Sequence, residues 1–139
     1  MRTNPFALVI MGTLIAALWS GLTTSQAWAA DILGARIGVR TDATRFVIDL
    51  TGKAEFSIPE KSSAERIVID LAKTKLAKGS KLPKRGNGLI SHAMVVGQGK
   101  DSSQVILFLK KPAKVKRSFR LPAKDKKPYR VVIDLAPQQ

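Results

Sequence analysis

Arginine and aspartate recur at a fixed spacing in three hexapeptides of this chain. The hexapeptides read RFVIDL at 45–50, RIVIDL at 66–71 and RVVIDL at 130–135, so that in each one Arg precedes Asp by four residues. A guanidinium group can donate two parallel hydrogen bonds to a carboxylate or phosphate, and neighbouring carboxylates can hold it in a fixed orientation. Recognition of an acidic ligand is therefore one interpretation of the pattern.

In an extended strand alternate residues share one face, so each hexapeptide predicts an apolar face and a charged face. The apolar faces begin at Phe46, Ile67 and Val131, and we expect them in the core. The opposite faces carry the candidate ligand-binding residues, which are Arg45 and Asp49, Arg66 and Asp70, and Arg130 and Asp134. If the first two hexapeptides are neighbouring antiparallel strands, Arg45 lies near Asp70 and Asp49 near Arg66.

These charged stripes have two interpretations. In the first, cross-strand ion pairs only keep the sheet surface soluble and in register, and a duplicated sequence copies them. In the second, the aspartates orient the arginines toward carboxylates of a ligand. The residues alone leave both interpretations open.

The chain has few residues that could serve in catalysis or metal binding. There is no cysteine, and the one histidine, His92, is expected to be structural or on the surface. A catalytic zinc site needs several ligands that one histidine cannot supply. We expect no enzyme activity, no catalytic residues, no metal and no cofactor.

The N-terminus has the pattern of a secretory signal peptide. A short positive region with Arg2 precedes 14 apolar residues, and Ala27 and Ala29 provide a small-residue cleavage site. The apolar run is shorter than the roughly 20 residues of a membrane-spanning helix. We expect residues 1–29 to be removed after Ala29, leaving a periplasmic protein with no stable membrane span and no nucleic acid partner.

Residues 30–139 carry 23 basic and 10 acidic side chains, a net charge of +13, which indicates a polyanionic partner. The charge is uneven, because residues 30–71 have a net charge of −1 and residues 72–130 have +15. A lysine-rich solvated surface is the alternative explanation.

Alternation of apolar and polar residues predicts eight strands and an all-β fold. Residues 35–50 match residues 94–109 at an offset of 59, and the third hexapeptide resembles the second. We interpret residues 30–139 as one domain with an internal duplication: repeat 1 at about 32–71, a basic linker at 72–88 and repeat 2 at about 89–135. Each repeat needs a partner to cover its apolar face, so the prediction is a β-sandwich of two symmetric four-stranded sheets. The expected strands lie near 32–39, 44–51, 54–58, 65–71, 89–97, 103–110, 114–121 and 129–135.

The ordered, duplicated set of motifs resembles the AMIN domain. It comprises ARIG (35–38), TRFVIDL (44–50), FSIP (56–59) and RIVIDL (66–71), followed by VVGQ (95–98), QVILFL (104–109), FRLP (119–122) and RVVIDL (130–135). The resemblance implies two four-stranded sheets, a periplasmic location and peptidoglycan binding. Such domains usually precede an N-acetylmuramoyl-L-alanine amidase or a pilus secretin, and direct it to the wall or division site; we expect the targeting module alone here.

The resemblance implies a non-catalytic module that binds peptidoglycan or another acidic envelope polymer through the sheet-face arginines, and an amidase or secretin in trans is a possible partner. One stripe departs from the pattern, since Gln104 stands in place of Arg and Phe108 in place of Asp. We include Gln104 in the candidate site and expect the two sheet faces to bind unequally. The alternative function is a periplasmic adaptor that binds another envelope protein by strand addition to a sheet edge.

Overall fold

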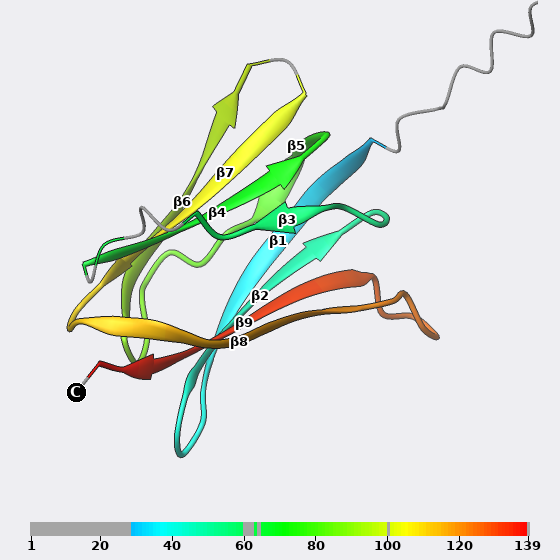
Figure 1. The fold of residues 1–139 in the computed structure, drawn as a ribbon. Coiled ribbons are helices and arrows are strands. Elements are labelled where there is room, and N and C mark those ends of the chain that lie inside the picture. The colour runs from blue at the N-terminus through cyan, green and yellow to red at the C-terminus, as the bar shows by residue number, and fades with distance from the viewer. Residues whose placement is uncertain (1–28, 60–62, 64, 100, 139) are drawn as a thin grey trace, which may run out of the picture.

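The computed structural model describes residues 29–59, 63, 65–99 and 101–138, which form two facing β-sheets (Figure 1). The predicted signal peptide lies outside these residues except for Ala29. The described strands are β1 (Ala30–Val39), β2 (Thr44–Leu50), β3 (Phe56–Ser57), β4 (Arg66–Ala72), β5 (Thr74–Lys81), β6 (Ile90–Gln98), β7 (Ser102–Leu109), β8 (Ala113–Leu121) and β9 (Tyr129–Pro137). The all-β sandwich is confirmed. In the described part of the chain, no helix is long and apolar enough to cross a membrane.

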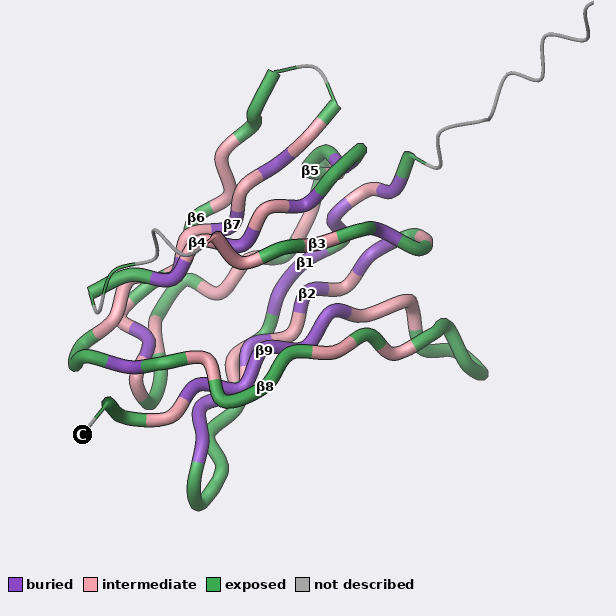
Figure 2. The backbone as a smooth tube through the Cα atoms, in the orientation of Figure 1, coloured by how far each residue is buried: buried purple, intermediate pink, exposed green. Residues whose placement is uncertain are grey.

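The three hexapeptides form β2, β4 and most of β9, and their alternation places one face of each strand in the core. The predicted core residues Phe46, Ile67 and Val131 are at most 4% exposed. Figure 2 shows the buried positions along the strands between the two sheets. Burying these apolar side chains stabilises the sandwich and fixes which residues remain on its outer faces.

Each sheet takes strands from both halves of the chain. Sheet A has the order β5-β1-β2-β9-β8, and sheet B has the order β3-β4-β7-β6. Because β2 pairs with β9 and not with β4, the pairings expected of Arg45 with Asp70 and of Asp49 with Arg66 are wrong. The apolar pattern identifies the buried face of a strand but does not identify its neighbour.

The two sheets are not symmetric four-stranded sheets, because the segment expected as a linker contains β5, which makes sheet A five-stranded. Lys73, with a φ of 52°, turns the chain from the end of β4 in sheet B to the start of β5 in sheet A. Strand β5 then pairs in parallel with β1. Buried Thr74 anchors this crossing, because its hydroxyl donates to the carbonyl of Leu71 and its carbonyl accepts a hydrogen bond from Ser103.

Gly34 allows β5 to lie against β1. The register of these strands shifts between Ile32 and Gly34, and Gly34 is opposite Lys81. A Cβ atom at Gly34 would lie 2.7 Å from the carbonyl oxygen of Lys81. A larger residue at this position would therefore push the edge strand away from the sheet.

Candidate functional site

The outer surface of sheet A, here called face A, carries four of the candidate residues. The β2–β9 register places Arg45 opposite Asp134 and Asp49 opposite Arg130. The two charged stripes of face A therefore lie beside each other, with unlike charges facing across the strands.

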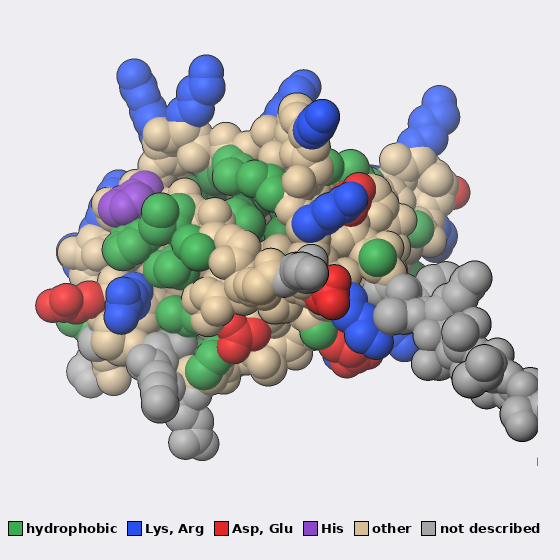
Figure 3. Space-filling view, turned by 90° about the horizontal axis from the view of Figure 1, so that it is seen from above, with side chains coloured by type: hydrophobic (Ala, Val, Ile, Leu, Met, Phe, Trp, Pro, Cys, Tyr) green, Lys and Arg blue, Asp and Glu red, His purple; other side chains and the backbone are tan. Residues whose placement is uncertain are grey.

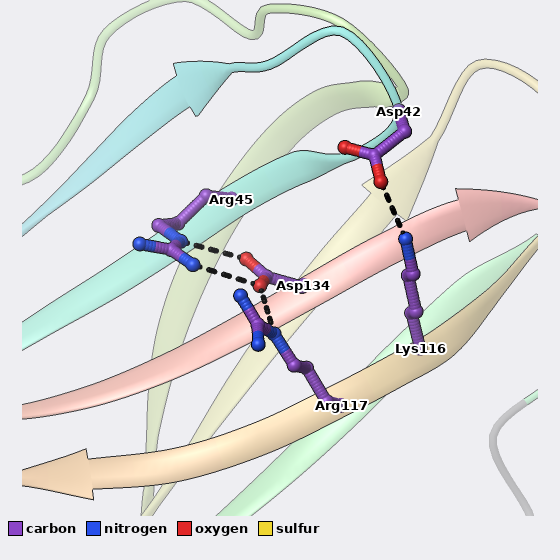
Figure 4. A network of polar contacts seen from close by, with 5 residues as sticks. All are labelled: Asp42, Arg45, Lys116, Arg117 and Asp134. Atoms are coloured by element: carbon purple, nitrogen blue, oxygen red, sulfur yellow. Dashed lines mark hydrogen bonds and ion pairs between the residues drawn. The ribbon is translucent and has the colours of Figure 1, made fainter.

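Arg45 holds Asp134 through two hydrogen bonds, and Arg117 of β8 adds a third (Figure 4). The Nε–Oδ1 and Nη2–Oδ2 distances from Arg45 are 2.8 and 2.9 Å, and Arg117 Nε lies 2.9 Å from Oδ2. The hydrogen bonds from Arg45 lower the pKa of Asp134 to about 2, although burial acts in the opposite direction, and Arg117 contributes further. The Asp134 side chain is only 3% exposed, so both of its oxygens are used inside the protein.

The remaining charged groups of face A are also engaged. The guanidinium carbons of Arg45 and Arg117 lie 5.6 and 5.3 Å from the centre of the Phe119 ring. Arg36 of β1 donates two hydrogen bonds to Asp49, at 3.1 and 3.0 Å. Arg130 donates to the backbone carbonyl of Pro128 at 3.3 Å. Asp49 and Asp134 on face A therefore have the geometry of the structural interpretation, in which charges satisfy each other across the sheet, whereas Arg130 forms no ion pair with a described residue.

The outer surface of sheet B, here called face B, has a different chemistry. Its inner strand β7 carries Gln104 and Phe108, the two residues that interrupt the repeated pattern. The register places Asp70 opposite Gln104 and Arg66 opposite Phe108. In the described part of the chain, neither Arg66 nor Asp70 forms an ion pair.

Face B also carries a row of apolar and aromatic side chains. His92 stacks on Phe108 with ring centroids 4.3 Å apart and an angle of 11° between the rings. Met94 of β6, which is 43% exposed, lies opposite Ile106, and Ile106 in turn lies opposite Val68. Figure 3 shows hydrophobic side chains gathered beside the histidine, with Lys and Arg side chains around them. Sequence reasoning noted Gln104 and Phe108 but missed His92, since only the pairing of β6 with β7 brings it to this surface.

A pocket of about 400 Å³ lies at the end of face B where β6 turns into β7. Two of the candidate residues, Asp70 and Gln104, line it. The Gln98 amide donates to the Gln104 side-chain oxygen at 3.1 Å, and the Ser102 hydroxyl donates to the Gln98 carbonyl at 2.7 Å. The other lining residues are Glu55, Phe56, Ser57, Leu71, Ala72 and Ser103. Carboxylates, amides and hydroxyls in one hollow suit a ligand with several hydroxyl, amide or ammonium groups.

Ten of the basic residues lie at 110–130, a segment that contains β8, an edge strand of sheet A, the turn that follows it and the start of β9. Three of its cations form ion pairs, Lys116 with Asp42, Arg117 with Asp134 and Arg120 with Glu55. Lysines on an edge strand also prevent unwanted pairing with other strands. Part of the positive charge therefore has a structural use, and the exposed remainder creates a field that attracts anions.

Among residues 29–59, 63, 65–99 and 101–138, no group of three His, Asp or Glu side chains is arranged to hold a metal ion. The absence of metal, cofactor and catalytic activity remains a prediction from the composition.

Comparison with curated proteins finds no match. Comparison with protein families finds one described as the AMIN domain, which matches residues 34–133. The match covers all or part of every strand from β1 to β9 and includes both outer faces. Since it spans most of the chain, this protein belongs to the AMIN domain family.

Proposed function

We propose that this protein is a non-catalytic module that binds peptidoglycan in the periplasm, and that face B makes the contact. AMIN domains are peptidoglycan-binding and targeting modules, and they occur in periplasmic proteins. The family supports the ligand class, and the contrast between the two sheet faces supports the choice of surface.

The proposal rests on one observation: β7 carries the uncharged residues Gln104 and Phe108, whereas the hexapeptides carry Arg and Asp at these positions. On face A, Asp134 is neutralised by Arg45 and Arg117, and Asp49 by Arg36. On face B, Gln104 stands opposite Asp70 where Arg45 stands opposite Asp134, and Phe108 stands opposite Arg66 where Asp49 stands opposite Arg130. Arg66 and Asp70 therefore keep their hydrogen-bonding capacity for a ligand. In this proposal the change in β7 creates the binding surface, whereas Arg45, Asp49, Arg130 and Asp134 maintain the structure of face A.

The chemistry of face B fits the two components of peptidoglycan. Stem peptides carry carboxylates, to which Arg66 can donate two hydrogen bonds. They also carry free amino groups, and the glycan carries hydroxyl and acetamido groups, for which Asp70, Gln104 and the pocket hydroxyls supply acceptors and donors. The flat His92–Phe108 stack offers an apolar surface to a sugar ring or to a stem-peptide side chain.

The excess of positive charge assists this contact at long range. Exposed charges are screened within about 8 Å at physiological ionic strength, so binding to an anionic wall should weaken as salt is added. The hydrogen bonds of the face B pocket depend less on salt, and a salt-resistant part of the affinity should therefore remain.

The test is co-sedimentation of the folded protein with purified sacculi. Arg66→Gln and Asp70→Asn remove one charge each and keep the side-chain size close to the original. We expect each to lower the affinity about tenfold, since a charge-assisted hydrogen bond contributes about 1.5–3 kcal/mol. Arg40→Gln is the matched control, because Arg40 is an exposed cation in the turn after β1 and lies on neither face.

The result that decides against face B is equal loss of binding in Arg40→Gln and Arg66→Gln. Such a result would mean that net charge alone attracts the protein to the wall. Thermal melting of each variant is measured in parallel, so that unfolding is not mistaken for loss of contact.

Export through residues 1–29 with cleavage after Ala29 belongs to the same proposal. The location of AMIN domains in periplasmic proteins supports it.

A further inference from the structure

We propose that β6 is a docking edge at which an extended, acidic segment of a partner protein adds as a fifth strand to sheet B. The site consists of the backbone of residues 92–98, whereas face B uses side chains, including that of Gln98, which donates to Gln104. A partner on this edge would leave the charged and polar groups of face B available to the wall.

The inference begins from a comparison of the four sheet edges formed by the described strands. A free edge presents unpaired backbone groups to any other strand, and proteins usually protect it with charges, especially lysine, or by keeping the strand short. Strand β5 carries three lysines and β8 carries two lysines and two arginines. Strand β3 is only two residues long. These three edges are protected.

Strand β6 has none of this protection. Its nine residues read ISHAMVVGQ and include no Lys, Arg, Asp, Glu or Pro. It forms the last strand of sheet B, and its named pairing partner is β7. The turn at Asn87 covers only the beginning of the strand, through a hydrogen bond from the Ile90 amide. Among the described residues, no strand pairs with the other side of residues 92–98.

The burial of β6 is consistent with a missing neighbour. Ala93 and Val95 lie opposite Leu107 and Val105, which are fully buried core residues. Ala93 and Val95 themselves pack against the core yet remain only partly buried. An added strand would cover them on the open side and would extend the apolar surface that Met94 begins on face B.

Charge complementarity identifies the partner as acidic. Strand β5 of sheet A lies close to β6 and β7 of sheet B. A strand added to β6 would therefore run near the β5 lysines, which are Lys75, Lys78 and Lys81. A second copy of this protein is disfavoured at the same place, because the chain carries a net charge of +14. The ligand is thus an extended peptide that alternates acidic and apolar residues.

The test uses the mature protein and a synthetic peptide of alternating glutamate and valine, with acetylated and amidated ends. Hydrogen–deuterium exchange is measured with and without the peptide. We expect slower exchange in 90–98 and unchanged exchange in 113–121. Strand β8 is an equally long edge strand that carries cations, so it is the control for simple attraction between opposite charges. A peptide with proline in place of alternate valines is the control for backbone pairing, since proline donates no hydrogen bond.

Two substitutions distinguish peptide binding at the β6 edge from general electrostatic attraction. Met94→Glu places a negative charge beside the edge and should weaken peptide binding at least tenfold. Val39→Glu is the matched control, because Val39 is 55% exposed and lies on β1 of the other sheet. The double variant Arg66→Gln, Asp70→Asn should bind the peptide normally, because these residues belong to face B and not to the edge.

Three results would overturn the proposal. The first is no protection of 90–98 at millimolar peptide, and the second is equal protection of β8, which would indicate simple attraction between opposite charges. The third is a dimer in sedimentation velocity with 90–98 protected in the absence of peptide. A second copy of the chain would then be the occupant of the edge.

Discussion

Arg45 and Asp134 form a bidentate ion pair between neighbouring strands, with N–O distances of 2.8 and 2.9 Å, although they are 89 positions apart in the sequence. The pair joins β2 of the first half to β9 at the end of the chain. A slip of one residue would turn the charged side chains of the shifted strand to the apolar face, so the pair and the hydrophobic pattern specify the same register. The recurring Arg and Asp letters therefore have a structural use on face A.

Asp134→Asn should destabilise the fold by about 3 kcal/mol, because it leaves the largely buried guanidinium of Arg45 without its counter-ion. Urea denaturation measures the change. Asp42→Asn is the control, since it breaks an ion pair whose side chains are 46% and 70% exposed and should cost less than about 1 kcal/mol. Equal effects of the two substitutions would show that Asp134 has no special structural role.

The stability of the wild type should depend on pH through Asp134. Its folded-state pKa is lowered from 3.8 to about 2, so the carboxylate contributes fully above the unfolded-state value and loses its contribution as the pH falls through the folded-state value. The difference between wild type and Asp134→Asn should be constant above about pH 5 and shrink between about pH 4 and pH 2. A difference that stays constant down to pH 2 would contradict this assignment.

Gly34→Ala should destabilise the protein by about 1–3 kcal/mol, because the new Cβ atom would lie 2.7 Å from the Lys81 carbonyl oxygen and displace β5. Gly38→Ala is the matched control on the same strand. A Cβ atom there would have no neighbour within 4 Å, and this substitution should be neutral or slightly stabilising. Hydrogen exchange should become faster in β5 for Gly34→Ala alone.

Alternation was sufficient to predict the strands of the hexapeptides, but it did not determine how they pair. The apolar residues of β2 and β4 alternate in the same way, and their burial requires only that one face of the strand is covered. The alternation therefore does not determine which strand lies beside them. Strand β5 was missed for a different reason. Its sequence TKLAKGSK is rich in lysine and has no alternating apolar face, and its pairing depends on Gly34 and Thr74, which lie outside the repeated motifs.

The offset between matching residues differs between the strands. An offset of 59 relates β2 to β7, but in the strands that precede them the structure pairs Arg45 with Gly38 and Gln104 with Val96. The paired residues Gly38 and Val96 thus differ by 58, because Val96 precedes Gln104 by eight residues and Gly38 precedes Arg45 by seven. The candidate residues of β2, β4, β7 and β9 could be chosen from the sequence alone. Which of them remain available to a ligand depended on the observed partner of each strand.

Cleavage after Ala29 should leave a folded protein that begins at Ala30. The Ala30 amide nitrogen donates to the Lys73 carbonyl at 3.1 Å and its side chain is 1% exposed, so β1 is bound to the sheet from its first residue. A new amino terminus at this nitrogen can keep that hydrogen bond. Intact-mass measurement of the exported protein checks the prediction, and a mass that includes residues 1–29 would indicate that the N-terminal segment is retained.

Gln104→Arg should convert the pocket end of face B to the chemistry of face A. The new guanidinium would lie opposite Asp70, as Arg45 lies opposite Asp134, and would neutralise the carboxylate and fill part of the pocket. Stability should change by no more than about 1 kcal/mol, because the new ion pair is partly exposed. Sacculus binding should fall about tenfold, because the new ion pair uses Asp70 and the amide of Gln104 is lost.

Thr41→Arg is the control for this substitution, because it adds the same charge at an exposed turn away from face B. If net charge alone determines affinity, both variants should bind an anionic wall more tightly than the wild type. If the pocket determines affinity, Gln104→Arg should bind more weakly although it is more positive, and Thr41→Arg should not. The two mechanisms therefore predict changes of opposite sign for one substitution, and co-sedimentation of folded variants distinguishes them directly.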